Sequence, residues 1–210
     1  MVDRITEIAV LRVVDGELVE RWSSLVNPGI PIPGNIQSLV GITDEMVAGA
    51  PAFPALAAEL RRLLDDCVFV AHNARFDYGF IKNEFQRIGE GFEAPVLCTV
   101  KLSRALYPQH HKHGLDALIS RHGLTCSARH RAMGDTEALF QFAEIVAGNF
   151  ERSVLDAAIV KAMKAPSRPA GLLEGVLEGI PQAPGVYVFH CANDLPVYVG
   201  RAASLRSRVM

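Results

Sequence analysis

The chain has 210 residues, of which 50% are hydrophobic, and a formal net charge of -2 at pH 7. This length allows one full core, with enough chain left for a linker and a small second unit. The weak net charge argues against a general nucleic-acid coat protein. Charged side chains interrupt the first thirty residues, and no apolar run approaches the roughly 18 residues of a membrane span. We therefore expect a soluble, cytoplasmic protein.

The charges are unevenly distributed along the chain. Residues 1–100 hold 8 Lys or Arg against 14 Asp or Glu, whereas 101–131 hold 6 basic residues, five of the seven histidines and one acid, Asp116. The last ten residues add three arginines and no acid. Either these segments form basic surfaces that face phosphate, or they are a solvated loop and a chain end. Four isolated cysteines without metal-site spacing indicate small buried residues in a reducing compartment.

Residues 1–150 predict an α/β fold with a mixed sheet. Strand patterns over 4–14 and 18–26, joined at Asp15-Gly16, predict a β-hairpin, and Thr43 is expected to cap a short helix. Hydrophobic periodicity and short apolar runs then predict a helix over 52–64, a buried strand over 68–71, a helix over 77–89, a strand over 96–99, a helix to about 106, and helices over 115–123 and 134–150.

The remaining 60 residues have a different composition. A terminal helix over 151–164 precedes APSRPAG at 165–171, which has the composition of a linker. GVYVF at 185–189 and PVYVG at 196–200, joined across 192–195, predict a second hairpin. We therefore divide the chain into a domain over 1–150, a helix and linker over 151–180, and a small unit over 181–210.

Two segments carry aspartates where a helix is expected to begin. A strand ending at His72-Asn73 leads to a helix near Asp77, and His130 lies in a loop five residues before Asp135. Each aspartate can cap free amides in the first helical turn. Each can equally hold a hard divalent cation such as magnesium or manganese, beside a histidine able to deprotonate a water.

The order and spacing of three motifs resemble the DEDDh exonucleases of the DNA polymerase III epsilon type. The motifs are VAHNARFDYGFI at 70–81, HGLDAL at 113–118 and HRAMGDTEAL at 130–139, and RITEIAVLRV, NPGIPIP and VGITDEMV also look like that family's. The resemblance covers about residues 3–148. It implies a ribonuclease-H-like fold and removal of nucleotides from a 3′ end of single-stranded DNA with Mg²⁺ or Mn²⁺. By motif match, Asp77 and Asp135 hold metal and His130 is the general base, while His72 and Asn73 are expected to contact the substrate end.

The family's first motif has no counterpart in this sequence. That motif, D-x-E-T-T-G, lies on a strand central to the sheet and supplies two further metal-binding carboxylates, whereas only Met1 and Val2 precede Asp3 here. Asp15-Gly16-Glu17 has the right letters but falls in a predicted turn. We expect a truncated sequence rather than a degenerate protein. The sheet should have an unpaired edge, and metal binding should be weak, which puts the activity of the chain as written in doubt.

Residues 181–210 resemble the opening of a GIY-YIG nuclease domain of the UvrC type. The matching residues are Gly185-Val186-Tyr187 and Tyr198-Val199-Gly200, followed by Arg201 and Arg208. By this resemblance the tyrosines support attack on phosphate and Arg208 stabilises its charge. The downstream glutamate of that family is absent, so this part predicts a partial domain.

The predicted function is a DNA exonuclease of replication or repair, with a DNA polymerase or excision-repair proteins as partners and no membrane. The alternative is a non-catalytic nucleic-acid-binding or partner-docking module that keeps the fold. Two weaker candidates remain: the cluster His110, His111 and His113, which we interpret as a solvated loop rather than a metal site, and Lys101 with Arg104, which could track a phosphate backbone.

Overall fold

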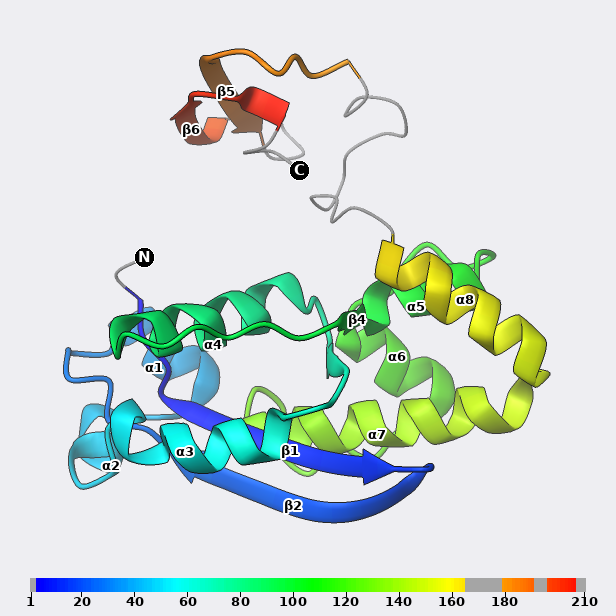
Figure 1. Ribbon diagram of the computed structural model, residues 1–210, viewed down its shortest axis with the longest axis horizontal. Coiled ribbons are helices and arrows are strands. Elements are labelled where there is room, and N and C mark those ends of the chain that lie inside the picture. Colours follow the sequence, from blue (N-terminus) through cyan, green and yellow to red (C-terminus); the bar gives the residue numbers. More distant parts are fainter. Residues whose placement is uncertain (1–2, 165–178, 191–195, 207–210) are drawn as a thin grey trace. The chain divides into compact units, whose positions relative to one another are not determined.

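The computed structural model describes residues 3–164, 179–190 and 196–206, with side chains from 198 in the last range. The chain forms two compact units, Met1–Lys164 and Ala165–Met210. Figure 1 shows the helices and strands of both units.

The first unit begins with the predicted β-hairpin. β1 (Glu7–Val14) pairs antiparallel with β2 (Glu17–Leu25). At the turn, Asp15 has a φ of 51° and Gly16 a φ of 88°. Two successive positive φ values characterise the tight turn that suits twisted strands, and they explain why Asp-Gly predicted it. Asp15-Gly16-Glu17 therefore lies in and beside a turn, as the sequence indicated.

Three helices follow the hairpin. In α2 (Asp44–Ala48), the Thr43 hydroxyl accepts a hydrogen bond from the Met46 amide at 3.4 Å, which confirms the predicted cap. α3 (Phe53–Leu64) matches the predicted helix and buries its apolar face. α1 (Gly34–Val40) was not predicted, because none of its seven residues is buried and it therefore lacks an apolar face to recognise.

Two short strand-to-helix units come next. β3 (Phe69–Ala71) leads to α4 (Arg75–Arg87), and β4 (Val96–Cys98), parallel to β3, leads to α5 (Thr99–Leu106). The prediction of a buried strand at 68–71 was wrong in one respect: Val68 and Val70 are 47% and 49% exposed. Side chains alternate between the faces of a strand, and β3 buries only one of its faces.

The strands of the first unit form two separate pairs rather than the single mixed sheet that was predicted. Among the described residues, β1 hydrogen-bonds to β2 and β3 to β4, with no ladder between the pairs. Each of these four strands therefore has one hydrogen-bonded neighbour among the described residues.

The rest of the first unit is helical. α6 (Leu115–His122), α7 (Ala132–Asn149) and α8 (Arg152–Lys164) surround a core that includes Phe142 and Leu118. α7 begins two residues earlier than predicted and packs along β1 (Figure 1). Because α8 packs against α5, the first compact unit continues to Lys164. A second apolar cluster around Phe53 and Phe85 joins α3 and α4 to the hairpin.

The second unit contains the predicted C-terminal hairpin. β5 (Gly185–His190) pairs antiparallel with β6 (Pro196–Ala202), so that Val188 lies opposite Val199. The predicted connection at 192–195 lies outside the described residues. In the described parts of both units, no helix combines the length and apolar character needed to cross a bilayer.

Candidate active site

Residues from the two predicted motif regions come together in the first unit. Asp77 lies in the first turn of α4 and Asp135 in the first turn of α7, as the sequence indicated. The charge of Asp135 acts on the titration of both Asp77 and His72. The folded chain thus places an aspartate from each motif, together with His72, in one electrostatic environment.

Asp77 has an environment that opposes its ionisation. Burial of the carboxyl, partly offset by its own backbone amide and supplemented by the negative charge of Asp135, raises the pKa of Asp77 to about 6. Two carboxylates that share a site repel one another unless a cation lies between or beside them. A positive charge near the two carboxylates would therefore favour their ionised forms.

His72 is held at the end of β3. Its Nδ1 lies 2.9 Å from the Thr99 Oγ1, and the buried Thr99 hydroxyl also donates to the Ala71 carbonyl at 3.3 Å. Burial, reinforced by the positive charge of Arg129, lowers the pKa of His72 to about 4, so the ring is neutral at pH 7. Its buried Nε2 has no hydrogen-bond partner in the described part of the chain. The next residue, Asn73, is exposed at a positive φ of 62°.

Arg129 supplies positive charge at the carboxylates. Its Nη1 lies 2.6 and 2.7 Å from the two carboxylate oxygens of Asp135, and its Nε donates to Asp116 at 2.6 Å. The contact with Arg129 is the main reason that the pKa of Asp116 is lowered. Sequence reasoning missed Arg129, because any of six basic residues over 101–131 could have faced the site.

The two residues after Arg129 have different environments. His130 is exposed in a loop, as predicted, and has a φ of 64°. Arg131 donates to Glu7 of β1 at 2.7 Å, and the same Glu7 accepts the Ala132 amide at 2.7 Å. Glu7 thereby satisfies a free amide at the start of α7 and ties that helix to the hairpin. Glu7 and Arg131 are 124 positions apart, so no local sequence pattern indicated their contact.

Gly134 allows α7 to begin close to the preceding loop. A Cβ at this buried glycine would lie 2.3 Å from the Ala128 carbonyl oxygen. A backbone atom cannot move aside as the end of a flexible side chain can. Glycine at this position therefore sets the approach of the loop that carries Arg129 and His130.

The histidine cluster at 110–113 is not exposed throughout. His113 is buried, and its Nδ1 lies 2.8 Å from Ser103 Oγ while its Nε2 lies 2.8 Å from the His110 carbonyl oxygen. The interpretation of 110–113 as a solvated loop was thus wrong for His113, which connects the loop to α5. Arg104 is exposed on α5, whereas Lys101 is partly buried.

Asp77 and Asp135 match a hard divalent cation in kind but not in number. Carboxylate oxygens suit Mg²⁺ and Mn²⁺, whose sites usually include several oxygen ligands. Among the described residues, however, no group of three or more His, Cys, Asp or Glu side chains could hold a metal ion. Arg129 also occupies both oxygens of Asp135. The two carboxylates are thus fewer than such a site usually has.

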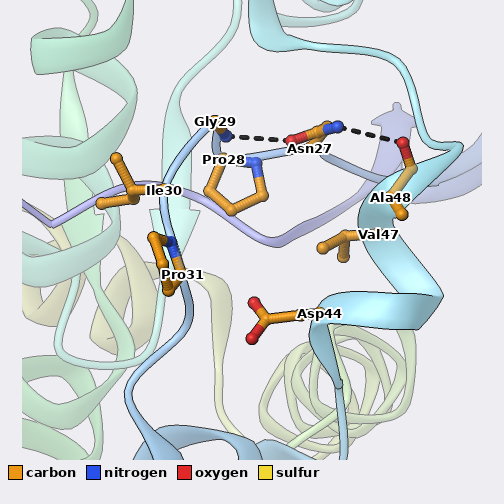
Figure 2. Close-up of a pocket in the computed structure, with 8 residues that line it drawn as sticks. All are labelled: Asn27, Pro28, Gly29, Ile30, Pro31, Asp44, Val47 and Ala48. Carbon is orange, nitrogen blue, oxygen red and sulfur yellow. Dashed lines mark hydrogen bonds between the residues drawn. The ribbon is translucent and has the colours of Figure 1, made fainter.

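A pocket of about 410 Å³ lies elsewhere, between the segment Asn27–Pro31 and α2. Figure 2 shows Asn27 linked to Gly29 and Ala48, and the Asn27 side chain accepts from the Gly29 amide at 2.9 Å and donates to the Ala48 carbonyl at 3.2 Å. Asp44 accepts from the Ile32 amide at 2.9 Å. These polar groups already stabilise the loop, so we assign the pocket a structural role.

The hairpin of the second unit brings its two tyrosines together. The ring centroids of Tyr187 and Tyr198 lie 5.9 Å apart, and a Cβ at Gly200 would lie 2.5 Å from the Tyr187 ring. Arg201 is exposed, and Arg208 lies outside the described residues. Ring packing against glycine accounts for this spacing of Tyr and Gly. The GIY-YIG assignment stays a prediction.

The α/β arrangement of the first unit is that of an exonuclease. The model of the exonuclease family RNase_T matches residues 1–142, which is more than half of the chain. The chain therefore belongs to this family.

Named relatives agree with this membership. A "DNA polymerase III subunit epsilon-like protein" of Rhodobacter capsulatus is 44% identical over 140 residues, which make up 65% of this chain and 20% of that protein. A "DNA polymerase III PolC-type" of Staphylococcus aureus is 37% identical over 137 residues, covering 65% of this chain and 10% of that protein. The chain thus spans a fifth or less of the length of these relatives.

Solved structures share the fold. "Exonuclease X in complex with 5' overhanging duplex DNA" is 29% identical, with a TM-score of 0.56 over 73% of this chain and 90% of that one. The nuclease domain of 3'hExo, described as a DEDDh family member bound to rAMP, is 16% identical, with a TM-score of 0.60 over 71% of this chain and 84% of that one. The second likeness supports the fold alone.

Proposed function

We propose that the first unit is a metal-dependent 3′-to-5′ exonuclease domain acting on the single-stranded 3′ ends of DNA in replication or repair. One observation carries the proposal: the exonuclease-family model matches residues 1–142, a range in which Asp77 and Asp135 each lie in the first turn of a helix. Family membership supplies the reaction class, and the convergence of the motif residues supplies a location.

Each residue receives a role from its position and chemistry. Asp77 and Asp135 would hold Mg²⁺ or Mn²⁺, which supplies charge neutralisation and activation of a water. His130 is exposed in the loop before α7 and would accept a proton from the attacking water. His72, neutral and with a buried Nε2 lacking a partner among the described residues, would contact the terminal nucleotide together with Asn73.

The two carboxylates are too few for a two-metal site. The resemblance to DEDDh exonucleases assigns two more carboxylates to a D-x-E strand, and in the described residues the pairs β1–β2 and β3–β4 are not joined by a ladder. Two metals clamp the attacking and leaving oxygens only when enough anionic ligands hold them. Full activity is therefore proposed for a form in which that strand is present.

The names of the relatives suggest the substrate and the partner. A structural relative is in complex with 5' overhanging duplex DNA, and two sequence relatives are named as DNA polymerase III proteins. We propose DNA as substrate, and a DNA polymerase or an excision-repair protein as partner. The hairpin of 181–210 is proposed as the opening of a partial GIY-YIG domain.

Nucleotide release from 3′-labelled single-stranded DNA with Mg²⁺ or Mn²⁺ tests the exonuclease proposal. The chain as given and a form extended by an upstream D-x-E-T-T-G strand are assayed side by side, each with its Asp135→Ala variant. We expect the extended form to release nucleotides and its variant to release none above background. If the extended form is no faster than its Asp135→Ala variant, the proposal fails.

The second candidate is a nucleic-acid-binding or partner-docking module without catalysis. The hydrogen bonds from Arg129 to both carboxylate oxygens of Asp135 favour this module, because they engage the oxygens that a metal ion would need. Such a module would bind DNA in a salt-dependent way, because released counterions drive binding, and without any dependence on Mg²⁺. A DNA-binding titration with Mg²⁺ or with EDTA separates the two functions.

A further inference from the structure

The parallel strands β3 and β4 bring two helix starts to one edge of the first unit. Ala71 lies opposite Cys98 in this pair, so α4 and α5 begin beside one another at the carboxyl ends of the strands. The His72 Nδ1 lies 2.9 Å from the Thr99 Oγ1, and the Thr99 hydroxyl donates to the Ala71 carbonyl at 3.3 Å. The residues that follow each strand therefore share an edge with His72, and ligands of open α/β folds gather at such edges.

Each of the two helices carries a cation in its first turn. Arg75 is the first residue of α4, and Lys101 is the third residue of α5. Burial is the main cause that lowers the pKa of Lys101, and the positive charge of Arg75 contributes in the same direction. Because charge interactions weaken with distance and are screened by salt, this effect indicates that the two cations are near one another. Arg104, the other candidate on α5, instead contributes to the electrostatic environment of His113.

We propose that Arg75 and Lys101 form a phosphate-binding pair that holds the DNA strand on the 5′ side of its terminal nucleotide. This inference rests on the proposed function, which assigns the terminal nucleotide to His72 and Asn73. All other phosphates of a strand bound by its 3′ end lie on the 5′ side. The pair therefore favours an oligonucleotide strand over a mononucleotide as the substrate.

Both side chains suit a backbone phosphate. A guanidinium can donate two parallel hydrogen bonds to phosphate oxygens, and a lysine ammonium binds phosphate as a point charge. Arg75 is exposed and Lys101 is partly exposed, so a ligand can approach both. Contacts to phosphate carry no sequence information. Such a pair would hold a strand of any sequence, as the removal of successive nucleotides requires.

The acidic side chains of the site limit where the strand can lie. The charges of Asp135 and Asp116 both act on His72, and the Asp116 side chain is 79% exposed. Carboxylates repel phosphates. The starts of α4 and α5 instead carry the two cations defined above. A strand whose end lies at His72 is therefore favoured to continue along the starts of these helices.

The pair predicts a defined salt dependence of DNA binding. Each phosphate contact to a single strand contributes about 0.7 to the slope of log affinity against log salt concentration, because counterions are released. Arg75→Gln and Lys101→Gln should each lower this slope by about 0.7, which corresponds to about fivefold weaker binding at about 0.1 M salt. The double variant should lower the slope by about 1.4 and weaken binding about 25-fold.

The experiment measures fluorescence anisotropy of a 5′-labelled oligothymidylate of about eight nucleotides, a length within the usual range of single-strand sites. The full chain is titrated in EDTA at several salt concentrations, with circular dichroism as a check of folding. Arg75→Lys and Lys101→Arg retain a cation and should retain the wild-type slope, which separates a role of charge from a role in folding. They also keep the inference testable if a glutamine variant does not fold.

Arg152→Gln is the matched control. It removes one positive charge from α8, where the Arg152 side chain is 88% exposed and paired with Asp156. We expect this control to keep the wild-type slope. A loss of slope as large as that of Arg75→Gln would overturn the inference, because net charge rather than a defined pair would then explain binding.

Two other results would also overturn the inference. One is an unchanged slope in the double variant of Arg75 and Lys101. The other is displacement of the labelled strand by oligoglutamate as effectively as by unlabelled DNA, because the surface would then be a docking site for acidic peptides. Nucleotide release by the extended form together with unchanged slopes would leave the exonuclease proposal standing. A loss of slope without nucleotide release would leave the phosphate-binding pair standing and contradict the exonuclease.

Discussion

Two clusters of arginine and carboxylate side chains in the first unit have opposite compositions. In one, Glu84 of α4 lies between Arg4 and Arg87, each at 2.7 Å, and its side chain is 2% exposed. In the other, Arg129 lies between Asp116 and Asp135, with both aspartates accessible to water. The first cluster has one carboxylate and two cations, and the second has one cation and two carboxylates.

The difference in burial gives the same chemistry two different roles. Breaking the Glu84 cluster would strand charge in the interior, so we infer that it stabilises the fold and connects the N-terminal segment to α4. Breaking the Arg129 cluster exposes charge to water, which costs little. A contact that costs little to break can be exchanged, and such contacts suit a site that must accept a ligand.

The largest effect is expected from breaking the buried cluster. Glu84→Ala should lower the free energy of unfolding by about 3 kcal/mol, because Arg4 and Arg87 both lose charged hydrogen bonds to a buried partner. Urea denaturation measures the loss. The control is Asp156→Ala, which removes an exposed ion pair and should leave the unfolding midpoint unchanged. A similar loss in both variants would remove the distinction between the clusters.

The second effect depends on pH and concerns the carboxylate beside the exposed cluster. The pKa of Asp77 is raised from 3.8 to about 6, so folding favours its protonated form. The wild-type chain therefore loses this stabilisation as pH rises from 4 to above 6. Asp77→Asn cannot ionise and should be more stable than the wild-type chain by about 2 kcal/mol at pH 8, with the difference vanishing near pH 4.

Thermal unfolding of both proteins in EDTA between pH 4 and 8 measures this difference. The low pKa of His72, about 4, has the opposite effect, because its neutral form is favoured by folding and stability is lost as pH falls from 6.5 towards 4. Both proteins share that effect, so it cancels in the comparison. A constant difference at all pH values would contradict the prediction for Asp77.

A third effect tests how tightly the loop of the exposed cluster is held. Gly134→Ala should destabilise the fold by about 1 to 2 kcal/mol, because the new Cβ would displace the Ala128 backbone. Gly148→Ala is the matched control in the same helix, where a Cβ has no neighbour within 4 Å. That control should stabilise the chain by about 0.5 to 1 kcal/mol. Denaturation midpoints that shift alike would show that the loop yields freely.

The smallest effect sharpens the contrast with Glu84. Arg129→Ala should change the free energy of unfolding by less than about 1 kcal/mol, because solvent screens the partly exposed pair. The same urea titration measures this change beside that of Glu84→Ala. A loss as large as that of Glu84→Ala would mean that Arg129 is a structural residue and not an exchangeable one.

The local pattern of the sequence predicted most elements because their causes are local. Asp15-Gly16 suited the turn of the first hairpin, Thr43 capped its helix, and apolar spacing marked α3, α4 and α7. α1 escaped prediction because it buries no residue. The exposure of Val70 escaped for a related reason: an apolar run does not reveal how many faces of a strand are covered.

The site residues were likewise predictable only where their positions have local causes. Motif spacing located Asp77, His130 and Asp135, and placed each at a loop or a helix start, because those positions follow from nearby residues. Tertiary structure alone decided that Arg129 neutralises Asp135, that Glu7 holds the start of α7 and that the two strand pairs remain separate. The Glu7 contact joins residues 125 positions apart, and such a contact leaves no periodic trace in the sequence. Arg129 is only six positions from Asp135, but the sequence does not reveal which of several nearby basic side chains turns toward that carboxylate.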